Sequence, residues 1–125
     1  HMKENGITVS DEKARVIAEK VSISSLKYSL LSLDRDKVVN FDIDRSLDVS
    51  RESGAYILYS YVRARSILDK AEYIPKDIDI DFTSLNENDY IISRLMSLFP
   101  IVLNESIKKY EVKPIVNYMY RLASS

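Results

Sequence analysis

The clearest hydrophobic pattern lies in residues 54–70, where apolar side chains, tyrosines and arginines separate onto different faces of a predicted helix. At 100° per residue, the apolar positions gather on one broad arc, as in a helix that faces a core. This stripe consists of Tyr56, Ile57, Tyr61, Ala64, Ile67, Leu68 and Ala71. The neighbouring arc carries Tyr59 and Arg63, and Tyr56 lies at the border between the two arcs. We therefore expect a central helix that packs on one side and leaves one edge free.

The N-terminal third of the chain combines helical spacing with one alternating stretch. Ser10, followed by two acidic residues, predicts the start of a helix. Apolar residues at helical spacing continue to Leu33, which predicts two short helices or one helix bent near Ser22. Residues 39–44 alternate between apolar and polar, the period of a strand. This stretch either pairs with the alternating residues 78–82 or lies as an extended arm across the helices.

Capping signals and prolines divide the C-terminal part into further helices. Ser84 and Glu87 have the spacing of a capping box, so a helix should begin near Leu85. Pro100 and Pro114 each fit the first turn of a following helix. Two apolar stripes follow from the spacing: Ile91, Ile92, Leu95, Met96 and Phe99, and then Ile115, Tyr118, Met119 and Leu122. The predicted fold class is all-α, a helical bundle with one short extended segment.

Composition limits the chemistry that the chain can perform. A length of 125 residues with 46% hydrophobic residues suits one core. The chain has no cysteine and two glycines, which excludes a disulfide framework and disfavours a glycine-rich phosphate loop. The only histidine, His1, stands with Met2 in what resembles the remnant of an expression tag. We therefore assign no catalytic residue and no metal ligand, and do not expect a self-contained enzyme.

Three alternating aspartates, Asp77, Asp79 and Asp81, raise the possibility of a calcium site. An EF-hand loop that began at Asp77 would need Gly at its sixth position and Glu at its twelfth, where Phe82 and Asn88 stand. A solvated acidic surface is the better interpretation. No apolar run is long enough to span a bilayer or to form a signal peptide, which predicts a soluble, cytoplasmic protein without a membrane partner.

The free edge of the predicted central helix favours one class of ligand. Aromatic rings beside cationic side chains form the combination that binds single-stranded nucleic acid. The alternative is that these tyrosines are amphipathic core residues whose hydroxyls reach water. A net charge of −1 gives no global attraction for a polyanion, so binding would depend on local groups such as Arg63, Arg65 and Lys70.

Several stretches resemble one protein family. Gly54-Ala-Tyr-Ile-Leu-Tyr-Ser-Tyr-Val-Arg-Ala-Arg-Ser-Ile-Leu68 is similar to the segment that opens the helical anticodon-binding domain, of the DALR type, in arginyl-tRNA synthetases. Residues 23–32 and 39–47 resemble upstream segments of the same family. Residues 97–100 and 116–123 resemble its Phe-Pro turn and its Tyr-Leu-Tyr-x-Leu-Ala helix. The likeness covers residues 14–125 in the order that the family has.

The resemblance implies an organisation and a context. Residues 1–9 would be the tag remnant and a flexible N-terminus, residues 10–47 a helical and extended connector after a catalytic domain, and residues 48–125 a DALR-type domain truncated at its C-terminus. The implied parent is a class I arginine–tRNA ligase, which uses ATP and magnesium; this fragment lacks its His-Ile-Gly-His and Lys-Met-Ser-Lys-Ser motifs and would hold no cofactor. Its implied partners are the anticodon stem-loop of tRNA(Arg) and the catalytic domain of the same enzyme.

Carried over residue by residue, the tRNA-binding candidates are Tyr56, Tyr59 and Arg63 on the central helix and Tyr118 on the last helix. The rings would stack on anticodon bases or pack beneath them, and the guanidinium would hold a phosphate or a base edge. Two positions depart from the family pattern, with Ala55 in place of Pro and Leu58 in place of Gln. The alternative function is a helical protein-interaction module that binds no RNA.

Overall fold

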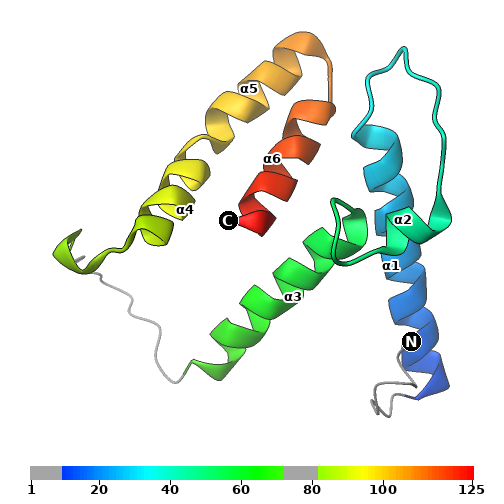
Figure 1. Cartoon of the computed structure of the whole chain (residues 1–125), viewed down its shortest axis with the longest axis horizontal. Coiled ribbons are helices and arrows are strands. Elements are labelled where there is room, and N and C mark those ends of the chain that lie inside the picture. Colours follow the sequence, from blue (N-terminus) through cyan, green and yellow to red (C-terminus); the bar gives the residue numbers. More distant parts are fainter. Residues whose placement is uncertain (1–9, 72–81) are drawn as a thin grey trace.

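The computed structural model describes residues 10–71 and 82–125, which fold into helices without a strand (Figure 1). The helices are α1 (Asp11–Leu31), α2 (Ile43–Leu47), α3 (Gly54–Lys70), the 3-10 helix η1 (Phe82–Ser84), α4 (Glu87–Ser97), α5 (Phe99–Lys109) and α6 (Lys113–Ser124). The all-α prediction is confirmed. The bounds of α3 also match the predicted central helix.

The N-terminal helix is one continuous element. Its N-cap is Ser10, whose Oγ accepts a hydrogen bond of 3.4 Å from the backbone N–H of Lys13. The helix passes Ser22 without interruption and ends at Leu31. Of the two alternatives that the sequence left open, the single helix is therefore correct.

Of the two alternatives for residues 39–44, the strand is wrong. Residues 33–42 form an irregular loop beyond the end of α1, and Ile43 already begins α2 (Figure 1). Asp42, one of the polar members of the alternation, is the N-cap, and its Oδ1 accepts a hydrogen bond of 3.0 Å from the N–H of Arg45. An N-cap residue has extended backbone, so its neighbourhood can imitate a strand in the sequence. Of the suggested pairing partner 78–82, all but Phe82 lies outside the described residues.

Helices α1 and α3 cross at their small residues. A Cβ added to Gly54 would lie 2.3 Å from the backbone oxygen of Ser24, so only glycine permits this approach. The Ser24 Oγ donates a hydrogen bond of 3.3 Å to the carbonyl of Gly54. Ser25 and Ser53 are 2% and 1% exposed. Serine and glycine, which are poor helix formers, therefore stand where two backbones come close together.

The start of α3 is fixed by its N-cap, Ser53. Its Oγ accepts a hydrogen bond of 3.0 Å from the N–H of Tyr56 and donates one of 2.7 Å to the carbonyl of Asp48. The residue before this cap is also held: the hydroxyl of Tyr28 on α1 donates a hydrogen bond of 2.8 Å to Oε1 of Glu52. Burial and this hydrogen bond raise the pKa of Tyr28. The capped end of α3 is thereby tied to α1.

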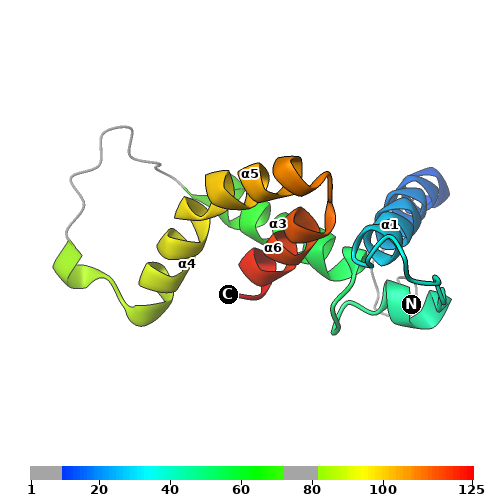
Figure 2. The same ribbon diagram turned by 90° about the horizontal axis from the view of Figure 1, so that it is seen from above.

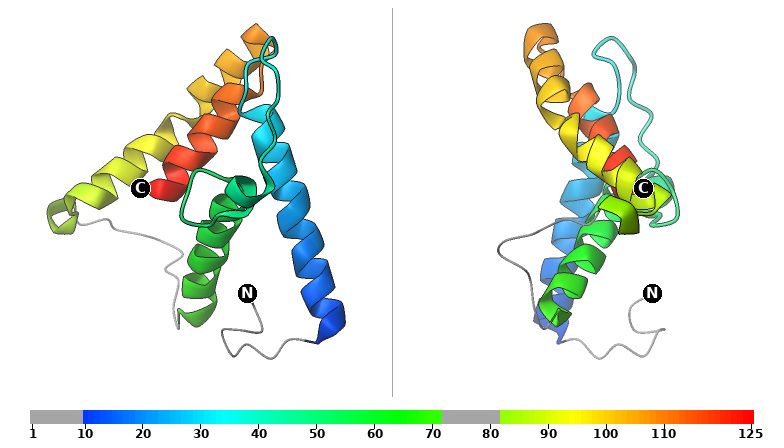
Figure 3. Two further views of the ribbon diagram at one scale, coloured as in Figure 1. Left: turned by 45° about the vertical axis from the view of Figure 1, so that its right-hand side comes forward. Right: turned by 90° about the vertical axis from the view of Figure 1, so that its left-hand side faces the viewer.

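The buried core is small and is organised around α6. The fully buried hydrophobic side chains are Tyr28, Ala55, Leu95, Val116 and Tyr118. Helix α6 packs against α3 on one side and α5 on the other (Figure 2). Many large hydrophobic side chains of the described helices are exposed, among them Ile67 on α3 and Met96 on α4. The bundle is thus open-sided, and Figure 3 shows α3 and the α4–α5 arm diverging from each other.

Two predicted apolar stripes are only partly buried. In α3, the stripe packs over its first turns, but Tyr61, Ile67 and Leu68 are 64%, 67% and 51% exposed. In α4, only Leu95 of the predicted stripe is buried, and Met96 is 61% exposed. The prediction of a core-facing stripe along the whole of each helix is therefore wrong, because no described element covers these faces.

The two proline predictions are confirmed, and one cap is corrected. Pro100 and Pro114 lie in the first turns of α5 and α6. Helix α4 begins at Glu87, with Asn86 rather than Ser84 as N-cap. The Asn86 side chain accepts hydrogen bonds from two backbone N–H groups, and Asp89 accepts one of 3.0 Å from the N–H of Asn86. Asn and Asp thus form the reciprocal box two residues beyond the predicted one.

Candidate nucleic-acid interface

The exposed edge of α3 carries an aromatic ring and a cation in contact. The guanidinium carbon of Arg63 lies 5.6 Å from the ring centroid of Tyr59, one helical turn earlier. Side chains four residues apart are neighbours on a helix, which explains the contact. Tyr59 is 49% exposed and Arg63 is also exposed. The pair therefore presents a ring and a positive charge to solvent together.

Arg63 and the next arginine along α3 differ in their ion pairs. Within residues 10–71 and 82–125, Arg63 has no ion-pair partner. Arg65 forms an ion pair of 3.0 Å between its Nε and Oδ1 of Asp69. Two residues along a helix correspond to about 200°, so the two arginines point to different sides. Of the local cations that the sequence suggested, only Arg63 stands over a ring.

Tyr56 has a mainly structural position between helices. Its ring centroid lies 5.6 Å from that of Tyr120 on α6, at an interplanar angle of 54°. Its hydroxyl donates a hydrogen bond of 3.3 Å to the carbonyl of Ala123. Tyr56 therefore joins α3 to α6, and it lies about 60° around α3 from Tyr59.

Tyr118 lies deeper in the molecule. It is 8% exposed, and its ring centroid is 5.6 Å from that of Phe99 on α5. Tyr120, two residues later, points toward α3 instead, as expected for this spacing on a helix.

Of the four predicted residues, the structure places Tyr59 and Arg63 together on the surface and Tyr56 and Tyr118 in helix packing. The sequence prediction omitted Tyr120, which the Tyr-Met-Tyr spacing could have indicated as the residue facing α3.

The described residues offer binding groups and little reactive chemistry. They contain no group of three histidine, cysteine or acidic side chains that could hold a metal ion. The aspartates considered for calcium, Asp77, Asp79 and Asp81, lie outside the described residues. None of the described helices is long and apolar enough to cross a membrane. What the exposed edge of α3 can do is stack on a planar base and hold a negative charge.

Comparisons with known proteins point to one family. The model of the DALR anticodon binding domain matches residues 57–125, more than half of the chain. An arginine–tRNA ligase of Halobacterium salinarum is 30% identical over 115 residues, 92% of this chain and 18% of that protein. The corresponding ligase of Korarchaeum cryptofilum is 36% identical over 123 residues, 98% of this chain and 18% of that protein. The chain thus spans less than a fifth of these curated relatives.

The fold has a close counterpart among solved structures. The Thermus thermophilus arginyl-tRNA synthetase superposes with a TM-score of 0.83, over 98% of this chain and 20% of that one. The sequence identity of the two is 20%. The arrangement of the helices in this chain is therefore one that also occurs in a solved structure.

Proposed function

Because the chain belongs to the family of DALR anticodon-binding domains, we propose that it binds the anticodon stem-loop of tRNA(Arg) as one part of an arginine–tRNA ligase. In such an enzyme, a separate catalytic domain would use ATP and magnesium to load arginine onto the tRNA in the cytoplasm. This chain would contribute affinity for the tRNA and would help to position it, and it would carry out no step of the loading reaction. Similarity to the two archaeal ligases supports this role.

The observation that carries the proposal is the exposed contact of Tyr59 and Arg63. The guanidinium lies over the ring of Tyr59, so its N–H groups are close to the ring. An anticodon base would stack on the accessible part of the ring, while the guanidinium would hold a phosphate or a base edge. Unstacked loop bases are the part of a tRNA that such a platform can bind.

The other two predicted residues would act beneath this platform. Tyr56 holds α6 against α3 through Tyr120 and the carbonyl of Ala123. Tyr118 holds α6 against α5 through Phe99. Their rings would pack under the RNA-binding edge and fix the position of α3, which lets the exposed pair bind without first being ordered.

Binding of a labelled tRNA(Arg) transcript at low salt tests the proposal by fluorescence anisotropy. We expect Arg63→Ala to raise the Kd about tenfold and to lower the dependence of log Kd on log salt, because one phosphate contact is lost. The matched control is Arg65→Ala, which removes the same charge from another side of α3 and should change the Kd less than about twofold. Equal losses from both variants, with helicity unchanged, would contradict the assignment of the site.

A further inference from the structure

Two ion pairs join the segment after α1 to the turn between α5 and α6. Nζ of Lys113 lies 2.7 Å from Oδ1 of Asp34, and Nη2 of Arg35 lies 3.5 Å from Oε1 of Glu111. The partners are 79 and 76 residues apart in the sequence. The hydrogen bond from Lys113 lowers the pKa of Asp34. These four residues, which we call the charge clasp, therefore connect two distant parts of the chain.

Each side of the charge clasp is held by backbone hydrogen bonds of its own. On the first side, the N–H of Lys37 donates a hydrogen bond of 3.1 Å to the carbonyl of Asp34, which closes a turn. On the second side, Tyr110 ends α5 in the left-handed conformation, with a φ of 53°. The N–H of Glu111 donates a hydrogen bond of 3.0 Å to the carbonyl of Ser106, as in a Schellman motif. The charged side chains thus project from two turns that are already formed, which lowers the entropy cost of pairing them.

The order of the charges favours one orientation of the two sides. Asp34 precedes Arg35, so the first side is negative and then positive. Glu111 precedes Lys113, which gives the second side the same order. The observed arrangement places each charge beside an opposite one, whereas the reversed arrangement would bring like charges together. Because the wrong arrangement is repulsive, the charge clasp specifies how the two sides meet.

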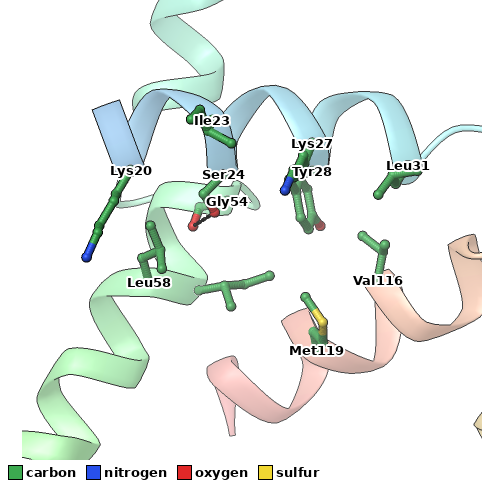
Figure 4. A pocket seen from close by; sticks show the side chains of 11 residues that line it. Lys20, Ile23, Ser24, Lys27, Tyr28, Leu31, Gly54, Leu58, Val116 and Met119 are labelled. Carbon is green, nitrogen blue, oxygen red and sulfur yellow. Dashed lines mark hydrogen bonds between the residues drawn. The ribbon is translucent and has the colours of Figure 1, made fainter. Parts of the chain in front are cut away.

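The charge clasp is a second fixed point for α1. The first is the crossing with α3, where the hydroxyl of Ser24 bonds the carbonyl of Gly54 (Figure 4). Hydrogen bonds from α1 to α2 and to Glu52 also reach residues that precede α3. Leu31, the last residue of α1, lies about 10 Å along the helix axis from Ser24. The charge clasp follows Leu31 and holds this end of α1 to the start of α6, far enough from the crossing to fix the angle of α1.

We propose that the charge clasp sets the angle between α1 and α6 and that salt opens it. Helix α1 lies outside residues 57–125, which match the domain model, so this angle orients the preceding helix relative to the helical domain. The four side chains are between 34% and 71% exposed, so dissolved ions screen their attraction. Exposed ion pairs add little to the free energy of unfolding, so opening the charge clasp changes the orientation of α1 and leaves the helices folded.

Distances between spin labels test the proposal by pulsed electron paramagnetic resonance. The chain has no cysteine, so Glu19→Cys and Arg121→Cys place one label on α1 and one on α6, both at exposed positions. We expect a narrow distance distribution for this labelled chain. Lys113→Glu should broaden it, although an acidic residue at the start of α6 is favourable for the helix itself. Asp34→Lys alone should also broaden it, and the two substitutions together restore opposite charges and should return the narrow distribution.

Salt and a matched variant complete the test. In about 1 M sodium chloride, where the screening length falls to about 3 Å, the distribution of the labelled parent chain should broaden. The control Arg65→Glu makes the same change of charge as Lys113→Glu and breaks an ion pair within α3, so it should leave the distribution unchanged. Single variants with the parent distribution, or a broadening that the double variant does not reverse, would overturn the proposal. Equal broadening by Arg65→Glu would also overturn it, since net charge would then be the cause.

Discussion

The two halves of α3 have similar sequence patterns but differ in how far their apolar side chains are buried. In the first half, Gly54 and Ala55 are buried against α1, and Tyr56 packs on α6. In the second half, Ile67 and Leu68 are more than half exposed, although the sequence places them on the same arc as Ile57. An apolar stripe therefore indicates which face of a helix could be buried, and the packing of neighbouring elements determines how much of that face is buried.

Gly54→Ala should produce the largest effect, at the packed end of α3. The new Cβ would lie 2.3 Å from the backbone oxygen of Ser24, so α1 and α3 must separate. We expect a loss of about 3 kcal/mol in the free energy of unfolding, measured by urea denaturation, despite the better helix propensity of alanine. Val62→Ala, which removes methyl groups from an exposed site on the same helix, is the control and should cost less than about 0.5 kcal/mol. A Gly54→Ala variant as stable as the parent would show that this crossing does not organise the fold.

Tyr28→Phe should have an intermediate effect beside the same crossing. Losing the hydrogen bond to Glu52 should cost about 1 kcal/mol at neutral pH, because the Glu52 carboxylate remains accessible to water. Burial and Glu52 raise the pKa of Tyr28, so the folded state retains this proton more strongly than the unfolded state. The stabilisation is therefore complete below the ordinary tyrosine pKa of about 10 and is lost as the pH rises above it.

Denaturant titrations at neutral pH and at stepwise higher pH measure this dependence. The parent chain should lose stability more steeply above about pH 10 than Tyr28→Phe does, since the variant has no proton to lose there. Parallel pH profiles for the two proteins would contradict the role given to the Tyr28 hydroxyl.

Ile67→Ser should have the smallest effect, at the exposed end of α3. With 67% of Ile67 exposed, little apolar area returns to water on unfolding, and the change in the free energy of unfolding should stay within about 0.5 kcal/mol. A loss above about 1.5 kcal/mol, together with a larger mass in sedimentation, would mean that another copy of the chain covers this half of α3 in solution. The contrast between the two halves would then apply only to the monomer.

Only the part of the candidate site that lies within one helix could be predicted from the spacing of residues. Tyr59 and Arg63 lie one turn apart, so their contact follows from the geometry of one helix. Tyr118 and Tyr56 required knowledge of α5 and α6, because their ring contacts are with Phe99 and Tyr120, which are distant in the sequence. Of the two departures from the family pattern, Ala55 is 3% exposed and Leu58 is half-buried.

By itself, the sequence determined the class of fold, the bounds of α3, the N-cap at Ser10 and the helix starts at Pro100 and Pro114. These features depend on backbone groups satisfied within a few residues, which local spacing records. Tertiary structure alone decided that residues 39–44 form a loop and a short helix, that Val116 is buried, and that half of α3 remains exposed. Burial depends on which surfaces meet, and in this chain α6 meets only the first half of α3 while the second half finds no described neighbour.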